Sequence, residues 1–194
     1  KTRHIPKVVI PASIHMDRFD EKIAIIGAGP AGLTAAFYLA ETGYRPTVFE
    51  KSEHPGGMLR YGIPSYKLEK DLLDAEIDVA KAMGVEIKTG IEVGKDVTIQ
   101  QLREQGYKAF YIAIGCAAGR LPGLENENAE GVMTAIDYLH DANCGNAPFA
   151  GKVVVVGGGN VAIDASRVSA RNAASSVFQF SLEQETSSLA SFIS

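Results

Sequence analysis

One arrangement of residues occurs twice in this chain and limits what it can fold into. In each copy a short run of β-branched residues leads into a glycine-rich turn, and a helix-forming segment follows. The turns are Gly-Ala-Gly-Pro-Ala-Gly at 27–32 and Gly-Gly-Gly-Asn-Val-Ala at 157–162, so the copies lie 130 residues apart. That spacing is too long for a solenoid repeat and fits two successive domains of one kind.

The segments around these turns alternate between strand and helix patterns. Strands are expected at 22–26, 46–50, 85–88, 108–114, 152–156 and 177–180. Helices are expected at 33–42, 68–83, 98–105, 134–141 and 160–171, and a loop at 54–64. This alternation predicts a three-layer α/β fold with a parallel sheet: a Rossmann-like domain followed by the first βαβ unit of a second one.

The first turn has the G-x-G-x-x-G spacing of a dinucleotide-binding loop. Gly27 permits the tight turn, Gly29 has no side chain to hold off a pyrophosphate, and Gly32 lets the helix pack closely on the strand. The pyrophosphate then meets free N–H groups at the helix N-terminus. Glu50, 23 residues after Gly27, is the expected acceptor for ribose hydroxyls. The alternative is a purely structural turn.

The second turn has alanine as its third small residue, which the fingerprint allows. Its expected acidic partner is Glu183, 26 residues after Gly157. A structural turn is again the alternative. Two dinucleotide sites in one chain predict two cofactors that exchange a hydride, usually a flavin and a nicotinamide.

Composition excludes several other classes. A net charge of −4 and a pI of about 5.6 argue against a nucleic-acid partner, and no apolar run reaches the ~18–20 residues of a membrane span. Cys116 and Cys144 are too few for a four-ligand metal or iron–sulfur site and too far apart for a redox pair. The four histidines are scattered, so no metal site is expected. Hydride transfer needs placement rather than a base, so we name no catalytic side chain.

Together, several motifs resemble the small subunit of glutamate synthase and its relatives, including the flavin/nicotinamide part of dihydropyrimidine dehydrogenase. The matching stretches are 25–33, Phe49-Glu50-Lys51, 56–64, 67–69 and 157–164. The resemblance implies FAD in the first domain and NAD(P)H in the second. It divides the chain into a lead-in at 1–20, the N-terminal part of an FAD-binding domain at 21–118, and a linker with an incomplete NAD(P)-binding domain at 119–194.

By this resemblance, the residues expected to contact FAD are Gly27, Gly29, Pro30, Ala31, Gly32, Glu50, Lys51, Gly57, Met58, Lys67, Val93, Ala113 and Gly115. Those expected to contact the nicotinamide nucleotide are Gly157, Gly158, Gly159, Asn160, Val161 and Glu183. Arg60 has two open roles, a contact to FAD or a partner and an ion pair that caps its own loop. Asp164 either supports the second loop, packs the helix or is solvated.

Three departures from the resemblance matter. The family's basic pair, which would neutralise a 2′-phosphate, is replaced by Leu182-Glu183, and this favours NAD(H) over NADP(H). No iron–sulfur domain is encoded, so a cluster must lie on another chain or a removed segment. The chain starts at Lys1, shows no signal peptide and stops within the second domain, so we expect a C-terminally truncated piece of a cytoplasmic protein.

The complete protein is therefore expected to be an oxidoreductase that passes a hydride from NAD(P)H to FAD and electrons to an iron–sulfur protein or larger oxidoreductase subunit. The alternative is a non-catalytic FAD- or nucleotide-binding module, or an inactive fragment, used for partner docking. A half-finished second sheet would leave an apolar face, which a homo-oligomer would complete.

Overall fold

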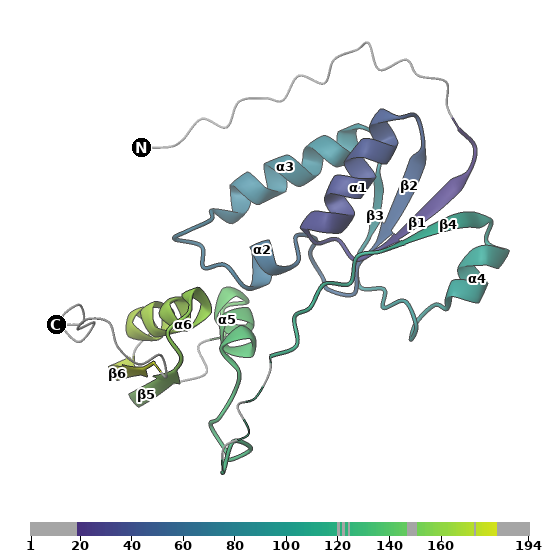
Figure 1. Ribbon diagram of the computed structural model, residues 1–194. Helices are drawn as coiled ribbons and strands as arrows, with labels where there is room; N and C mark the ends of the chain where they lie inside the picture. Colours follow the sequence, from purple (N-terminus) through teal and green to yellow (C-terminus); the bar gives the residue numbers. More distant parts are fainter. Residues whose placement is uncertain are drawn as a thin grey trace. The chain divides into compact units, whose positions relative to one another are not determined.

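The computed structural model describes residues 19–119, 121, 123, 125–146, 151–172 and 174–181. The chain forms two compact units that divide between Ala117 and Ala118 (Figure 1).

The first unit is built on a four-stranded sheet in the order β3-β2-β1-β4. Its strands are β1 (Lys22–Ile26), β2 (Arg45–Phe49), β3 (Glu86–Lys88) and β4 (Tyr107–Ile112). All neighbouring strands run parallel, and Ile26 at the end of β1 pairs with Phe49 on one side and Ile112 on the other. The carboxyl ends of β1, β2 and β4 therefore meet at one edge, where ligands bind in open parallel sheets.

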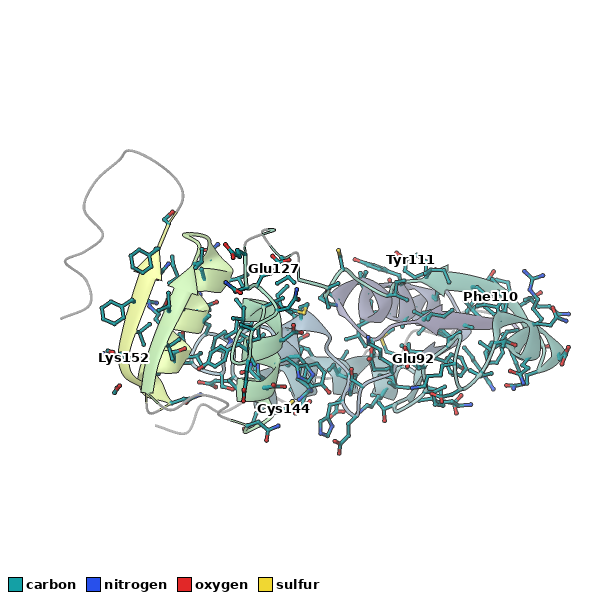
Figure 2. The ribbon with its side chains drawn as sticks, turned by 90° about the horizontal axis from the view of Figure 1, so that it is seen from below. Glu92, Phe110, Tyr111, Glu127, Cys144 and Lys152 are labelled. Atoms are coloured by element: carbon teal, nitrogen blue, oxygen red, sulfur yellow. The ribbon has the colours of Figure 1, made fainter. Side chains whose placement is uncertain are left out.

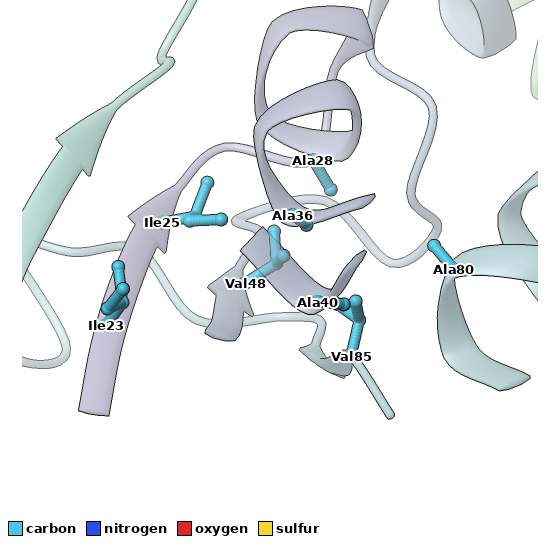
Figure 3. Close-up of a cluster of buried hydrophobic side chains, with 8 residues drawn as sticks. All are labelled: Ile23, Ile25, Ala28, Ala36, Ala40, Val48, Ala80 and Val85. Atoms are coloured by element: carbon cyan, nitrogen blue, oxygen red, sulfur yellow. The ribbon is translucent and has the colours of Figure 1, made fainter. Parts of the chain in front are cut away.

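Helices cover the sheet of the first unit from both faces. The helix α1 (Pro30–Glu41) and the helix α3 (Lys70–Ala82) pack on one face with the core residues labelled in Figure 3: Ile23, Ile25, Ala28, Ala36, Ala40, Val48, Ala80 and Val85. On the other face α4 (Ile99–Glu104) brings Leu102 against Ala24, Phe49 and Tyr107. Because β1 is buried from both sides, its sequence is a continuous apolar run without alternation.

The second unit places two helices and a parallel pair of strands around a smaller core. The elements are α5 (Ala135–Asn143), β5 (Gly151–Val156), α6 (Asn160–Arg171) and β6 (Ala174–Phe180). Alanines and Val168 of α6 pack on Val153, Val155 and Val177 of the strands, and Tyr138 and Leu139 of α5 join the same cluster. The alternate strand residues Val154, Val156, Phe178 and Phe180 are exposed.

The α/β fold with a parallel sheet is confirmed, and the expected strands and helices are present with ends shifted by a few residues. One helical turn was not expected: α2 (Met58–Tyr61) lies within the predicted loop 54–64. Almost all of the lead-in, with the exception of residues 19–20, lies outside the described residues, as does the tail from 182 onward. In the described part of the chain, no helix is long and apolar enough to cross a membrane.

Candidate functional site

The first glycine-rich loop leaves β1 and enters α1 through a turn that only glycine fits. Gly27 has a φ of +105°, and a Cβ at this position would collide with the Ala113 carbonyl oxygen. Its N–H donates to Phe49 O at 2.8 Å. A Cβ on Gly32 would collide with the Gly27 carbonyl, which keeps α1 close to the strand. The roles expected of Gly27 and Gly32 therefore have a steric basis in the fold.

Gly29 is different, because the fold itself leaves room beside it. Its φ of −78° suits any residue, and an added Cβ would have only an ordinary contact with Gly57 Cα at 3.9 Å. Gly29 is also the N-cap of α1, where no side chain bonds the first N–H groups, and Pro30 follows. By contrast, Thr98 caps α4 with its hydroxyl. The uncapped N–H groups of a twelve-residue helix suit an anion such as a pyrophosphate.

The turn that carries Gly57 approaches this loop closely. Gly56 N–H donates to Ala28 O at 2.7 Å, and a Cβ on Gly57 would lie 2.8 Å from Gly29 Cα. Gly57 has a φ of +53°, so a side chain there is disfavoured by both backbone and space. Two glycine backbones thus lie against each other and form one surface without side chains, which suits the close approach of a pyrophosphate.

Glu50 follows β2 and is only 6% exposed. Its Oε2 accepts Ala28 N–H at 2.7 Å, and its Oε1 accepts Ser52 N–H at 2.8 Å. These two bonds fix the carboxylate beside the glycine-rich loop. Because each carboxylate oxygen has two acceptor positions, one on each oxygen stays available for a ribose hydroxyl. The geometry fits the ribose role expected for Glu50.

Several other expected residues lie near the same edge. Ala113 N–H donates to Ile26 O, and Ala113 lines the Gly27 turn. Ile91 N–H donates to the backbone carbonyl of Glu50, which holds the start of the 91–97 segment beside the end of β2, and Val93 in this segment pairs with Val97. Lys51, Met58, Lys67 and Gly115 are exposed.

Arg60 matches the second of its two open roles. Its side chain is 13% exposed, its Nε donates to Pro55 O at 2.5 Å, and its guanidinium pairs with Asp74 of α3. The side chain therefore bonds its own loop at Pro55 and joins that loop to α3 through the ion pair with Asp74.

The second glycine-rich loop repeats the geometry of the first. Gly157 has a φ of +135° and donates to Phe180 O at 2.6 Å, as Gly27 does to Phe49 O. Gln179 donates to Gly157 O at 2.9 Å and accepts from Ser166 of α6. Gly159 is the uncapped N-cap of α6. The next two positions on α6, Asn160 and Val161, are exposed.

Strand register identifies a residue that sequence spacing missed. Ile26 pairs with Phe49, and Glu50 follows; Val156 pairs with Phe180, and Ser181 follows. A Cβ on Gly158 would lie 2.5 Å from Ser181 Oγ, so Ser181 flanks the second loop as Glu50 flanks the first. Glu183 lies outside the described residues. The signal was in the sequence, since both positions follow a phenylalanine that ends a strand.

Neither a metal site nor a redox disulfide is formed by the described residues. No group of three or more potential metal ligands is present among them. Cys116 and Cys144, the latter labelled in Figure 2, are free and exposed thiols.

The sequence pattern of the pyridine nucleotide-disulphide oxidoreductase family matches residues 21–185, which include both glycine-rich loops. The chain belongs to this family. The family is named for pyridine nucleotides, which are the nicotinamide cofactors. Membership agrees with the Rossmann-like fold of the chain and with the resemblance found in the sequence.

Curated relatives support the same placement. The chain is 48% identical over 161 residues to "NADP(+)-dependent formate dehydrogenase subunit beta" of Moorella thermoacetica, covering 81% of this chain and 23% of the relative. It is 38% identical to "Glutamate synthase [NADPH] small chain" of Escherichia coli K12, covering 81% and 36%. It is 42% identical to "NAD-dependent dihydropyrimidine dehydrogenase subunit PreT" of the same strain, covering 74% and 34%. The chain thus spans about a quarter to a third of these relatives.

Two solved structures share the fold. FprA of Mycobacterium tuberculosis in complex with NADPH matches with a TM-score of 0.67 at 21% identity, covering 82% of this chain and 42% of that one. Thioredoxin reductase of Lactococcus lactis matches with a TM-score of 0.58 at 26% identity, covering 82% and 55%.

Proposed function

We propose that this chain is the cofactor-binding part of a flavoprotein oxidoreductase that takes a hydride from NAD(P)H onto FAD. The observation that carries the proposal is the repeated loop geometry. In each unit a glycine N–H donates to the carbonyl of the last residue of the neighbouring β-strand. A helix whose N-terminus has no side-chain cap follows the turn. FAD, when bound, supplies a carrier that accepts a hydride and releases single electrons.

FAD is assigned to the first loop because the residues there fit it. Glu50 holds its carboxylate beside the loop, with Oε2 on the Ala28 N–H and Oε1 on the Ser52 N–H, and Gly29 and Gly57 present adjacent backbones without side chains. Lys51, Met58, Lys67, Val93, Ala113 and Gly115 would complete the contacts. The nicotinamide nucleotide is assigned to the second loop, at Gly157, Gly158, Gly159, Asn160 and Val161.

The choice between NADH and NADPH is proposed to depend on Ser181. A carboxylate at the position of Glu50 repels a 2′-phosphate, whereas a serine hydroxyl does not. The relatives are named for NADP(H) in some cases and NAD in others, so they lend no support to the NAD preference expected from Glu183. We therefore propose NAD(P)H without that preference.

A partner is proposed because the relatives are named as subunits or a small chain. An iron–sulfur protein or a larger oxidoreductase subunit is the proposed acceptor of the electrons. The competing function is a nucleotide-binding module for docking. The exposed strand residues Val154, Val156, Phe178 and Phe180 of the second unit favour that alternative, because an apolar sheet face suits a protein partner.

A visible spectrum separates the two functions. The purified chain is saturated with FAD, freed of excess cofactor, and mixed with NADH or NADPH without oxygen. Bleaching of the yellow colour supports the oxidoreductase, and persistent colour supports the binding module. A chain that takes up no FAD contradicts the assignment of the first loop.

A variant of the second loop provides the matched control. Gly159 has a φ of −74° and nothing within 4 Å of an added Cβ, so the fold tolerates Gly159→Val. The valine would project into the proposed pyrophosphate position. The variant should stay yellow and lose bleaching. Bleaching at the unaltered rate would contradict the second site.

A further inference from the structure

The turn at 55–63 carries Gly57 toward the first glycine-rich loop, and cationic side chains hold it from behind. Lys70, the first residue of α3, donates from Nζ to Leu59 O at 2.9 Å and to Ile63 O at 2.6 Å. One ammonium therefore ties together two carbonyls, one within α2 and one just after it. Charge-assisted bonds of this kind are stronger than bonds between neutral groups.

Arg60 holds the beginning of the same turn. Its Nε bonds the Pro55 carbonyl, and its guanidinium pairs with Asp74, one helical turn beyond Lys70 on α3. Arg60 is also close enough to Lys70 to lower the pKa of that lysine, in addition to the larger effect of burial. Both cations therefore connect the turn to α3, Lys70 directly and Arg60 through Asp74.

The helix α3 is a firm support for these contacts. Its residues Leu73, Ile77 and Ala80 are buried. Leu73 also closes the space behind the turn, since a Cβ on Gly56 would lie 2.8 Å from Leu73 Cδ2. On the opposite side, Gly56 N–H bonds Ala28 O, and Gly57 lies against Gly29. The turn is thus held between α3 and the glycine-rich loop.

We propose that Lys70 and Arg60 are positioning residues for the dinucleotide of the first unit. They fix the backbone of the turn against α3 and thereby hold Gly57 against Gly29, so that the two glycine backbones together form the surface that a pyrophosphate would contact. Their action passes through the backbone carbonyls of Pro55, Leu59 and Ile63. The inference rests on the proposed FAD site and adds the part of the chain that shapes it.

Replacement of Lys70 by methionine tests this inference. Lys70→Met keeps the length of the side chain and removes both bonds to the turn. We expect the Kd for FAD to rise by about tenfold, since the loss of charge-assisted bonds loosens the turn that holds Gly57 against Gly29. The Kd is measured by titration well below the unfolding temperature, where each variant is almost fully folded. A change in stability alone does not move this Kd.

Two further variants provide the control and the rescue. Lys81→Met removes an exposed lysine of the same helix whose ion pair is with Asp78, and FAD affinity should stay unchanged. Lys70→Arg retains a cation that can reach the same carbonyls, so it should recover most of the affinity. A Lys70→Arg variant as weak as Lys70→Met would contradict the role of the charge.

A second route keeps the test informative where Lys70→Met does not fold. Asp74→Asn removes the negative charge on α3 that pairs with Arg60. The Asp74 side chain is 53% exposed, so the substitution should not disturb folding. It should raise the Kd for FAD by about threefold. Wild-type affinity in whichever of these variants folds overturns the positioning role alone. A wild-type chain that takes up no FAD overturns both this inference and the proposed function.

Discussion

Two glycines of the first loop, Gly27 and Gly29, have different reasons to be glycine. The fold requires Gly27, which combines a positive φ with the nearby Ala113 carbonyl. Nothing in the fold requires Gly29, whose φ and surroundings accept a methyl group. A glycine that the fold does not require marks a place where a ligand approaches the protein backbone closely.

Alanine substitutions separate these two reasons. Gly27→Ala should lower the free energy of unfolding by at least about 1–2 kcal/mol, because an L residue is strained at this φ. Gly29→Ala should leave stability nearly unchanged and weaken FAD binding by at least about tenfold, since the methyl group would meet the pyrophosphate. Thermal denaturation and FAD titration measure the two effects. Equal loss of stability in both variants would contradict this division.

The carboxylate of Glu50 also has a structural role, and its contribution to the free energy of unfolding can be measured. In Glu50→Gln the amide nitrogen replaces one of two oxygens that now accept N–H groups of Ala28 and Ser52. One buried N–H loses its acceptor, which should cost about 1–3 kcal/mol. Urea unfolding of the FAD-free chain checks the value. An unchanged midpoint would mean that these bonds contribute little.

Ser181 gives the corresponding test in the second unit. Ser181→Glu restores the carboxylate that the first unit has at the same register position. NADPH affinity should fall by about tenfold or more relative to NADH, because the carboxylate repels a 2′-phosphate. Parallel titrations with both nucleotides measure the ratio. An unchanged ratio would show that the adenosine ribose lies elsewhere.

At the scale of elements, α3 combines a core face with a polar start that holds the neighbouring turn. Leu73, Ile77 and Ala80 anchor it, and Lys70 reaches the turn. Burial and, second, the Arg60 charge lower the pKa of Lys70 below its ordinary 10.5. The folded chain therefore releases this proton at lower pH than the unfolded chain.

The sign of this shift sets a pH dependence. Between the lowered pKa and 10.5 the unfolded chain holds more protons, so the contribution of Lys70 to unfolding free energy rises with pH in that window. Arg60→Gln removes a like charge and should raise the pKa of Lys70. Nitrogen NMR of the Lys70 Nζ measures this pKa in the wild-type chain and in Arg60→Gln. An unchanged Lys70 pKa in Arg60→Gln would show that burial alone causes the shift.

At the scale of the whole molecule, the two units differ in how well their sheets are covered. In the first unit both sheet faces have buried clusters. Phe110 of β4 packs on the cluster beneath α4, while Tyr111, the next residue of the strand, is exposed (both labelled in Figure 2). In the second unit, α6 covers one face of β5 and β6. The residues of the other face, Val154, Val156, Phe178 and Phe180, are 49–59% exposed within the described chain.

This apolar surface predicts self-association of the chain when it is alone. Exposed apolar patches on a sheet promote contacts with other chains. Val154→Thr with Phe178→Thr should reduce association without loss of folded structure, because both side chains are about half exposed. Sedimentation over a range of concentrations measures the mass. A wild-type chain that is monomeric throughout would contradict the prediction.

Local patterns predicted much of the fold and of the first site. The runs at β1 and β5, the glycine spacing and the acid after β2 identified both loops and Glu50, since each depends on residues close in sequence. The helical turn α2 was missed because glycine and proline surround it. It depends on Lys70 and Arg60, whose contacts bridge the turn and α3.

The repeated strand, glycine loop and helix follow from local residue patterns, because backbone sterics and hydrophobic periodicity act within short segments. Which residue lies beside each loop depends on how the strands and helices pack. Ser181 occupies the register position in the second unit that Glu50 has in the first, and Arg60 pairs with Asp74 of α3. These outcomes depend on strand register and helix packing, which bring together groups that no local pattern connects.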